Sequence, residues 1–256
     1  MTTSSPLGTF RERLRRGDRL LGTFIKTPHP AVVEVLSHAP LDCLCIDAEH
    51  APFDRGDLDR AVLAAHARQM PILVRIPSAE PSAILNVLDL GATGIIIPHI
   101  TTRDGAQAAA AACRYGRGGR GYAGSPRAAN YGTLAMADII SRANAEVTVI
   151  AQIEDSEALE HLDGIAALEG IDALFVGRMD LTVSLSAASP GDAVVVDAVK
   201  KICDAARRHR RSVGMFTSTI EEARQWFDAG AGLFLLSSDQ QWLLQGANAM
   251  RQAFGS

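Results

Sequence analysis

The feature that most constrains the fold is a regular alternation of short apolar runs with longer amphipathic stretches along all 256 residues. Runs such as "GIIIP" and "VTVIAQI" are continuously apolar, as expected of strands in a parallel sheet that is covered on both faces. Gly closes several of the amphipathic stretches, in "LGATG", "LEGID" and "DAGAG", where it would end a helix. The alternation therefore predicts repeated β–α units.

Eight such units can be placed along the chain. The predicted strands are Leu20–Lys26, Asp42–Asp47, Ile72–Ile76, Gly94–Pro98, Val147–Ile153, Ala173–Gly177, Ser212–Phe216 and Leu233–Ser237. The predicted helices are Ala31–Ala39, Arg55–Arg68, Pro81–Leu90, Asp104–Tyr115, Glu157–Asp163, Asp192–Arg208, Ile220–Ala229 and Gln240–Phe254. Eight units in a chain of this length predict a single-domain (β/α)8 TIM barrel over residues 1–256. An open doubly wound sheet is disfavoured because no GxGxxG motif follows the first strand.

The composition excludes several classes of function. A net charge of −4 gives no basic footprint for nucleic acid. No apolar run reaches the ~20 residues that a membrane helix needs, and the N-terminal stretch lacks the apolar core of a signal peptide. Four scattered cysteines without a CxxC motif predict buried thiols, with a redox or metal pair as the alternative, and a cytoplasmic location.

Candidate functional residues gather where the predicted strands end, which is where TIM barrels carry their chemistry. They are Lys26, Asp47, Glu49, His50, Arg75, His99, Gln152, Glu154, Asp155, Arg178 and Asp180. Glu154 and Asp180, on adjacent strands, could converge on a divalent cation, because hard carboxylate oxygens suit Mg²⁺ or Mn²⁺. The alternative is that such a carboxylate caps the following helix, as Asp155 and Asp180 could both do.

Arg75 and His50 suggest acid–base chemistry on an anion. An arginine at the end of a barrel strand could hold a carboxylate or a developing oxyanion, or it could pair with an Asp at the rim. His50 could be a general base whose tautomer Asp47 fixes, or it could cap a helix.

Absences narrow the reaction further. The chain has three lysines, and only Lys26 lies at a predicted strand end, so a Schiff-base mechanism would depend on it alone. No GxxxxGK phosphate loop and no GxSxG nucleophile elbow is present.

Motifs from about Leu21 to the final helix, taken in order, resemble the HpcH/HpaI family of class II pyruvate aldolases. They are "IDAEHAP", "VRIP", "VLDLGATGIIIPHI", "RGGRGY", "AQIED", "GIDALFVGRMDL" and "DAGAGLFLLSSD". The resemblance implies a carbon–carbon lyase that cleaves a 4-hydroxy-2-oxo acid to pyruvate and an aldehyde through a metal-stabilised enolate. The implied cofactor is a divalent cation, Mg²⁺ or Mn²⁺ first and Co²⁺ or Zn²⁺ as alternatives.

The resemblance also implies roles for individual residues. Glu154 and Asp180 match the metal ligands. His50 matches the catalytic histidine, with Asp47 and Asp89 at the positions of acids that support it.

The substrate-binding residues follow in the same way. Arg75 matches the arginine that faces the oxo oxygen, and Gln152 matches a glutamine that contacts the substrate. Backbone amides around Met179 and Asp180 match the cradle of the pyruvate carboxylate. The chain departs from the family pattern at "GRMDL", where "GPxDL" is common, and Arg178 could there favour a substrate with an acidic tail.

Two alternative functions and an oligomeric state are also expected. The rivals are a related barrel lyase acting on a CoA thioester, whose nucleotide the arginines of residues 117–127 would bind, and a non-catalytic barrel that binds a 2-oxo acid. The resemblance implies a homo-oligomer, a hexamer or trimer, in which the C-terminal helix "QQWLLQGANAMRQAF" is exchanged between subunits.

Overall fold

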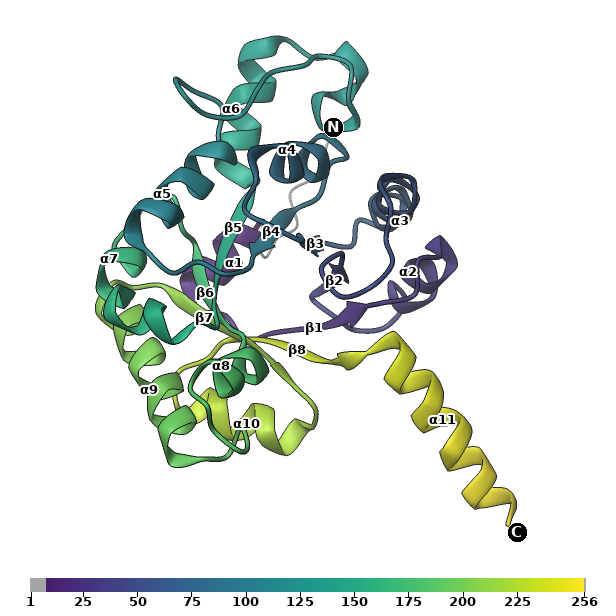
Figure 1. Ribbon diagram of the computed structural model, residues 1–256. Helices are drawn as coiled ribbons and strands as arrows, with labels where there is room; N and C mark the ends of the chain where they lie inside the picture. The colour runs from purple at the N-terminus through teal and green to yellow at the C-terminus, as the bar shows by residue number, and fades with distance from the viewer. Residues whose placement is uncertain (1–7, 256) are drawn as a thin grey trace.

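The barrel predicted from the alternation is confirmed by the computed structural model, which describes residues 8–255. Residues 1–7, which belong to the N-terminal stretch that lacks a signal-peptide core, and residue 256 lie outside this range. Eight parallel strands follow one another around a closed barrel, and the first pairs with the last (Figure 1). They are β1 (Leu20–Ile25), β2 (Cys43–Asp47), β3 (Ile72–Arg75), β4 (Gly94–Ile97), β5 (Thr148–Ile153), β6 (Ala173–Val176), β7 (Ser212–Thr217) and β8 (Leu233–Ser238).

Helices cover the outside of the barrel and link successive strands (Figure 1). They are α1 (Phe10–Arg16), α2 (Pro30–Leu36), α3 (Arg55–Ala67), α4 (Pro81–Asp89), α5 (Arg103–Ala112), η1 (Arg127–Gly132), α6 (Met136–Glu146), η2 (Ser156–Glu160), α7 (Leu162–Ala166), α8 (Arg178–Ser184), α9 (Ala193–Arg208), α10 (Ile220–Asp228) and α11 (Asp239–Phe254). Within residues 8–255, no helix is both long and apolar enough to cross a bilayer.

The core has two layers, as the continuously apolar strands require. One face of each strand packs against the surrounding helices, and the other fills the barrel with side chains that include Phe24, Leu73 and Phe175. Helix α1 closes the N-terminal end of the barrel, because Phe10 and Leu14 join this inner layer. The opposite end, where the strands finish, is left for polar side chains.

Four helical segments, α1, η1, α6 and α8, were not predicted from the sequence. Helix α1 is short, η1 and α6 lie between α5 and β5, and α8 begins at Arg178, directly after β6, with Gly177 as its N-cap. The predicted helix Glu157–Asp163 is divided into η2 and α7. The short helix α8 matters most, because it places Arg178, Met179 and Asp180 on a first helical turn at the mouth of the barrel.

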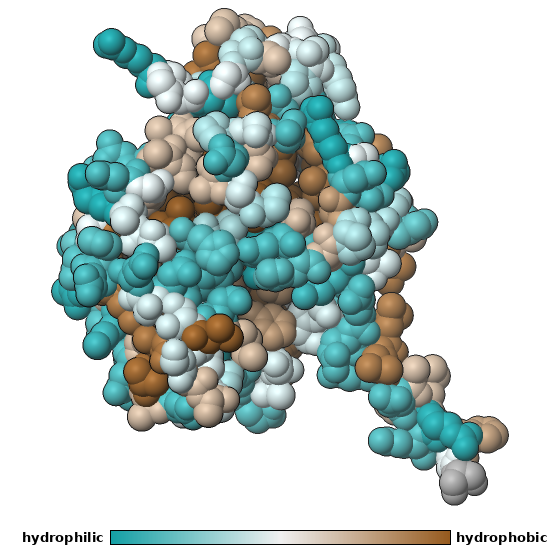
Figure 2. All heavy atoms as spheres, viewed as in Figure 1, coloured by the Kyte–Doolittle hydropathy of each residue, from teal (hydrophilic) through white to brown (hydrophobic). Residues whose placement is uncertain are grey.

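Helix α11 does not pack on its own barrel but projects away from it (Figure 1). Asp239, its first residue, is the one buried residue of this helix. Leu243, Leu244, Met250 and Phe254 are exposed, and Figure 2 shows apolar side chains along the projection.

Candidate active site

Asp47 and Arg75 form the buried base of the site. They are register partners at the ends of β2 and β3, so their side chains emerge side by side. Arg75 donates from Nε to Asp47 Oδ1 over 3.1 Å and from Nη2 to Oδ2 over 2.9 Å, the two-pronged geometry that a guanidinium and a carboxylate share. Burial works against both charges, but the hydrogen bonds from Arg75 still hold the pKa of Asp47 below its ordinary value. Those bonds to Asp47 likewise hold the pKa of Arg75 above its ordinary value, against the effect of burial.

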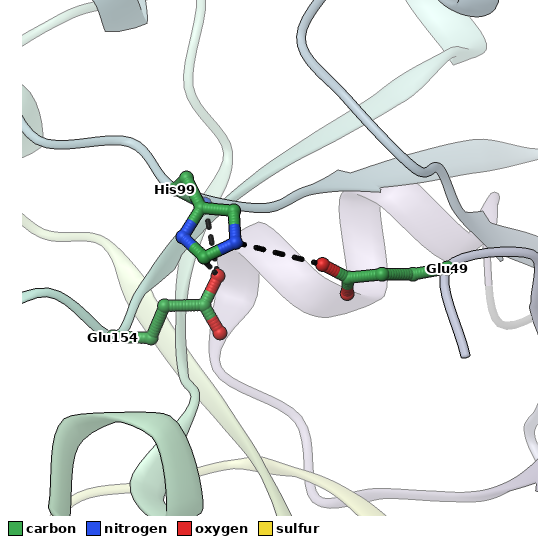
Figure 3. Close-up of side chains that lie close together, drawn as sticks. All are labelled: Glu49, His99 and Glu154. Carbon is green, nitrogen blue, oxygen red and sulfur yellow. Dashed lines mark hydrogen bonds and ion pairs between the residues drawn. The ribbon is translucent and has the colours of Figure 1, made fainter. Parts of the chain in front are cut away.

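A second group of side chains meets beside this pair. Ligand atoms of Glu49, His99 and Glu154 lie within 4.8 Å of one another, and Figure 3 shows the imidazole between the two carboxylates. His99 Nε2 is 3.8 Å from Glu49 Oε1, and His99 Nδ1 is 3.5 Å from Glu154 Oε1. His99 has a left-handed backbone (φ 53°), which is uncommon for a residue other than glycine and turns the chain sharply after β4. Its N–H donates to Glu154 Oε1 over 2.9 Å and so holds the turn in place.

The chemistry of these three side chains fits a divalent cation. Glu49 Oε2 is buried and accepts no hydrogen bond, although Arg75 Nε lies 3.3 Å away. The pKa of Glu49 is raised, mainly by burial and also by the negative charge of Glu154, while Arg75 opposes the shift. A cation bound between the carboxylates would remove this repulsion and satisfy the unpaired oxygen. Carboxylate oxygens with an imidazole nitrogen are ordinary ligands for Mn²⁺ and similar ions.

The predicted ligand pair, Glu154 and Asp180, is placed on neighbouring elements. Glu154 follows β5 and is buried, whereas Asp180 is exposed on the first turn of α8. Gly177 connects them: a Cβ at this position would lie 2.5 Å from Glu154 Oε2, so the carboxylate sits directly against the start of α8. Glu49 and His99 were not assigned as ligands from the sequence. Only their positions after β2 and β4 could have indicated them, and the ligand role of Asp180 stays a prediction.

An open cavity of about 340 Å³ lies over this end of the barrel. The residues singled out from the sequence that line it are Lys26, His50, Arg75, Arg178, Met179 and Asp180. Aromatic rings of Phe24, Phe175 and Phe216 form part of its wall. Its size suits a small molecule of a few carbons rather than a polymer.

His50 is held through its main chain. Its N–H donates to Asp47 Oδ1 over 3.1 Å, while its imidazole Nε2 is 3.7 Å from Glu49 Oε2. The support predicted from Asp47 therefore reaches the backbone of His50, and the carboxylate nearest the ring is Glu49. About half of the His50 side chain is exposed, so the ring can meet a ligand in the cavity.

Gln152 and Asp89 have contacts different from those expected of substrate-binding and acid–base groups. Gln152 is fully buried and its amide donates to Glu154 Oε2, so in the described structure it orients a candidate ligand. Asp89 ends α4 and accepts a 2.6 Å hydrogen bond from Arg120, away from the cavity. Their predicted roles stay predictions.

Three arginines to which the sequence assigned possible ligands form ion pairs within the fold. Arg178 forms an ion pair with Glu222 of α10 and lies 5.8 Å above the Trp226 ring. Arg120 is buried against Asp89, and Arg127 pairs with Asp59 over 2.8 Å. An acidic substrate tail on Arg178 and a nucleotide on residues 117–127, where Arg117 is exposed, stay predictions.

A cation-dependent enzyme on a TIM barrel is the class of protein that this arrangement defines. The sequence profile of the HpcH/HpaI aldolase/citrate lyase family matches residues 20–245, and the chain belongs to that family. The predicted family and the predicted enzyme class, a metal-dependent aldehyde-lyase, are thereby confirmed.

Similar proteins match nearly the whole length of the chain. A hydroxypyruvate/pyruvate aldolase of Paraburkholderia phytofirmans is 38% identical over 263 residues, which cover 98% of this chain and 97% of the relative. A 4-hydroxy-2-oxovalerate aldolase of Rhodococcus jostii is 32% identical, with 98% of this chain and 97% of the relative covered. The crystal structure of a family protein from Burkholderia cenocepacia superposes with a TM-score of 0.91 at 34% identity, covering 96% and 98% of the two chains.

Proposed function

We propose that the chain cleaves a 4-hydroxy-2-oxo acid to pyruvate and an aldehyde, with a divalent cation as cofactor. Family membership supports the aldolase activity, and the names of the relatives support a pyruvate or hydroxypyruvate half. The observation that carries the proposal is the convergence of Arg75, His50 and the cluster Glu49–His99–Glu154 beside one small cavity.

Two sets of residues are candidates for holding the cation, and Glu154 belongs to both. The resemblance favours Glu154 with Asp180, and the geometry brings Glu49 and His99 to Glu154. When bound, the cation supplies Lewis-acid polarisation of the 2-oxo group. An all-carboxylate pair suits Mg²⁺, whereas an imidazole in the set shifts the preference towards Mn²⁺ or Co²⁺.

Arg75 is suited to stabilise the substrate oxygen that gains negative charge. Asp47 and the Phe24 ring, whose centroid is 4.8 Å from the guanidinium carbon, fix the orientation of Arg75 before substrate binds. A preorganised cation costs no rearrangement at the moment of reaction, which is why such groups lower barriers effectively. Arg75 would face the 2-oxo oxygen as the C3–C4 bond breaks and its electron pair moves into the pyruvate half.

His50 is suited to accept the proton that the substrate loses. In the cleavage direction the 4-hydroxyl loses its proton while C4 becomes the aldehyde carbon, and the half-exposed imidazole of His50 can accept that proton. Asp47, by holding the main chain of His50, keeps the ring at the same rim as Arg75. Met179 and Asp180, on the first turn of α8, would offer backbone N–H groups to the pyruvate carboxylate.

Exchange of the pyruvate methyl protons with deuterated water, followed by NMR, tests the proposal without any aldehyde. We expect exchange that EDTA abolishes and that Mn²⁺ or Mg²⁺ restores. Exchange that survives EDTA and is trapped by borohydride would instead indicate a Schiff base on Lys26. His50→Ala should slow aldol cleavage by about 100-fold or more while leaving the cation midpoint unchanged.

We also propose that the protein is a cytoplasmic homo-oligomer, a trimer or hexamer, with α11 exchanged between subunits. Four free, buried cysteines support a reducing compartment. The apolar side chains of α11 lack cover, and a groove between α10, β1 and β8 is lined by Ile220, Phe227 and Phe234. A neighbour's α11 would cover this groove. Leu243→Asp should lower the mass measured by light scattering, and an unchanged mass would argue against the exchange.

A further inference from the structure

Helix α8 carries the N–H groups of Met179 and Asp180, yet little in its own sequence holds it in place. It has 7 residues, and its N-cap residue, Gly177, makes no side-chain hydrogen bond. Its buried residues are Leu181 and Thr182, whereas the Met179 side chain is 59% exposed. Helices this short are not stable by themselves, so contacts with the rest of the barrel must fix the position of α8.

Arg178, the first residue of α8, connects this helix to α10, which lies beside it (Figure 1). Its Nη2 donates to Glu222 Oε1, and the two side chains are only 15% and 22% exposed. The guanidinium carbon also lies 5.8 Å from the centroid of the buried Trp226 ring, on the same helix as Glu222. The ion pair is therefore largely shielded from water, which makes it stronger than a pair at an open surface.

Glu222 also holds the segment that follows β7. Its second oxygen, Oε2, accepts the N–H of Ser218 over 2.8 Å. Its own N–H donates to the hydroxyl of Thr219, the residue that caps α10, over 3.2 Å. Arg178 and Ser218 both line the cavity. One carboxylate of α10 thus connects two parts of the cavity wall, the start of α8 and the segment after β7.

The last turn of α8 is held by different contacts. The hydroxyl of Ser184 accepts the N–H of Ser156 over 2.8 Å and donates to the Ser156 hydroxyl over 3.1 Å. Loss of the pair between Arg178 and Glu222 would therefore release the first turn of α8 and leave the last turn attached. The first turn is the part that lines the cavity, through Met179 and Asp180.

We propose that Glu222 and Arg178 are positioning residues, which hold the first turn of α8 so that its N–H groups stay directed at the carboxylate of pyruvate. Neither side chain has to touch the substrate for this role. The inference rests on the proposed function and specifies which contacts behind the cavity set the affinity for the 2-oxo acid. Donors that are fixed before binding require no ordering when the ligand arrives, so the pair should affect the binding of pyruvate more than the chemical step.

Exchange of the pyruvate methyl protons, measured at saturating Mn²⁺, tests the proposal without any aldehyde. Arg178→Met and Glu222→Gln should each raise KM for pyruvate by about tenfold, the factor for a lost charge-assisted hydrogen bond, and leave kcat within about threefold. In Glu222→Gln a donor replaces one of the two acceptor oxygens, so the contacts with Arg178 and Ser218 cannot both be kept.

Three further variants separate positioning from a general loss of stability. The double variant Arg178→Met/Glu222→Gln should bind pyruvate no more weakly than the weaker single variant, because both changes remove the same contact. Arg178→Lys should retain most of the affinity, since it keeps the positive charge. Glu221→Gln is the matched control, because Glu221 is the exposed neighbour of Glu222 on α10.

Deuterium uptake by the backbone amides of residues 177–184, followed by mass spectrometry, gives a readout that does not depend on activity. Uptake there should be faster in Glu222→Gln than in the wild-type protein or in Glu221→Gln. An unchanged KM for pyruvate, additive losses in the double variant, or a loss confined to kcat would each overturn the proposal. Absent methyl-proton exchange in the wild-type protein would refute the aldolase itself, and amide uptake alone would then decide whether the pair holds α8.

Discussion

Gly177→Ala is the substitution that tests most directly whether the position of Glu154 is what prepares the cation site. Gly177 has φ −82° and ψ 73°, which alanine can adopt, so the effect of the change is steric rather than conformational. The added Cβ would lie 2.5 Å from Glu154 Oε2 and 2.6 Å from Glu154 Cβ. Ordinary carbon contacts are about 3.5–4.0 Å, so the side chain or helix α8 must move by about 1 Å.

Glu154 has little room to absorb this movement. It is 1% exposed, and its two oxygens accept the His99 N–H and the Gln152 amide. We expect a loss of about 1–3 kcal/mol in the free energy of unfolding, as for other overpacked sites. A displacement of about 1 Å at a reacting centre costs about 100-fold in rate, so the loss of activity should exceed what the stability change explains.

The assay is Mn²⁺-dependent exchange of the pyruvate methyl protons, titrated with metal and accompanied by thermal unfolding. Gly177→Ala should raise the metal concentration at half-maximal exchange by at least about tenfold, consistent with a misplaced ligand. Gly121→Ala is the matched control, because its Cβ would meet no heavy atom within 4 Å. An unchanged metal midpoint in a folded Gly177→Ala protein would refute the placement of Glu154 against α8.

Two further predictions concern the rest of the barrel. Asp172 is fully buried at the N-terminal end of the barrel, which α1 closes. Arg11 lies 2.9 Å and Arg114 3.5 Å from its carboxylate. Asp172→Asn should therefore cost about 3 kcal/mol and lower Tm by about 6–12 °C in calorimetry, and a change under about 1 kcal/mol would contradict a structural role. Burial raises the pKa of Cys113 to about 12 and that of Cys203 to about 11, from an ordinary value of 9.0. Both thiols should resist iodoacetamide in the folded protein near neutral pH, and rapid labelling would show that they are accessible. Above about pH 9 the unfolded chain releases these thiol protons while the folded chain keeps them. The contribution of the two thiols to stability is therefore complete below that pH and is lost as the pH rises towards their pKa values in the folded protein. Urea midpoints measured across this pH range will show the loss.

The strands were predictable because burial on both faces requires apolar residues within each short segment of the sequence. A barrel strand is buried on both faces, so runs such as "GIIIP" are apolar throughout, and all eight expected starts lie within one residue of the observed ones. The barrel also fixes where strand ends meet, which is why reading only those positions found Asp47, Arg75 and Glu154. Helix α8 was missed because it is 7 residues long and its N-cap residue, Gly177, has no side chain to cap it.

The part of the site that escaped prediction depends on backbone geometry. His99 reaches Glu154 because it adopts a left-handed backbone conformation, and the residues "IPHI" do not predict that conformation. Glu49 was visible in "IDAEH" but had no assigned role, since the turn after β2 decides whether a side chain faces the cavity. The partner of Arg178 was equally hidden, because Glu222 lies 44 positions away on α10.

Asp47 connects these observations, because one buried carboxylate positions three functional groups. It accepts two hydrogen bonds from Arg75, one from the main chain of His50, and it lies 3.1 Å from Lys26 Nζ. Arg75 and Lys26 share this single carboxylate, so the positions of both cations at the cavity wall depend on it. Neutralising Asp47 would therefore do more than remove support for His50: it would free Arg75 to turn fully towards Glu49, which lies 3.3 Å from its Nε. The segment "IDAEH" thus contributes the buried carboxylate Asp47, the candidate base His50 and the candidate cation ligand Glu49.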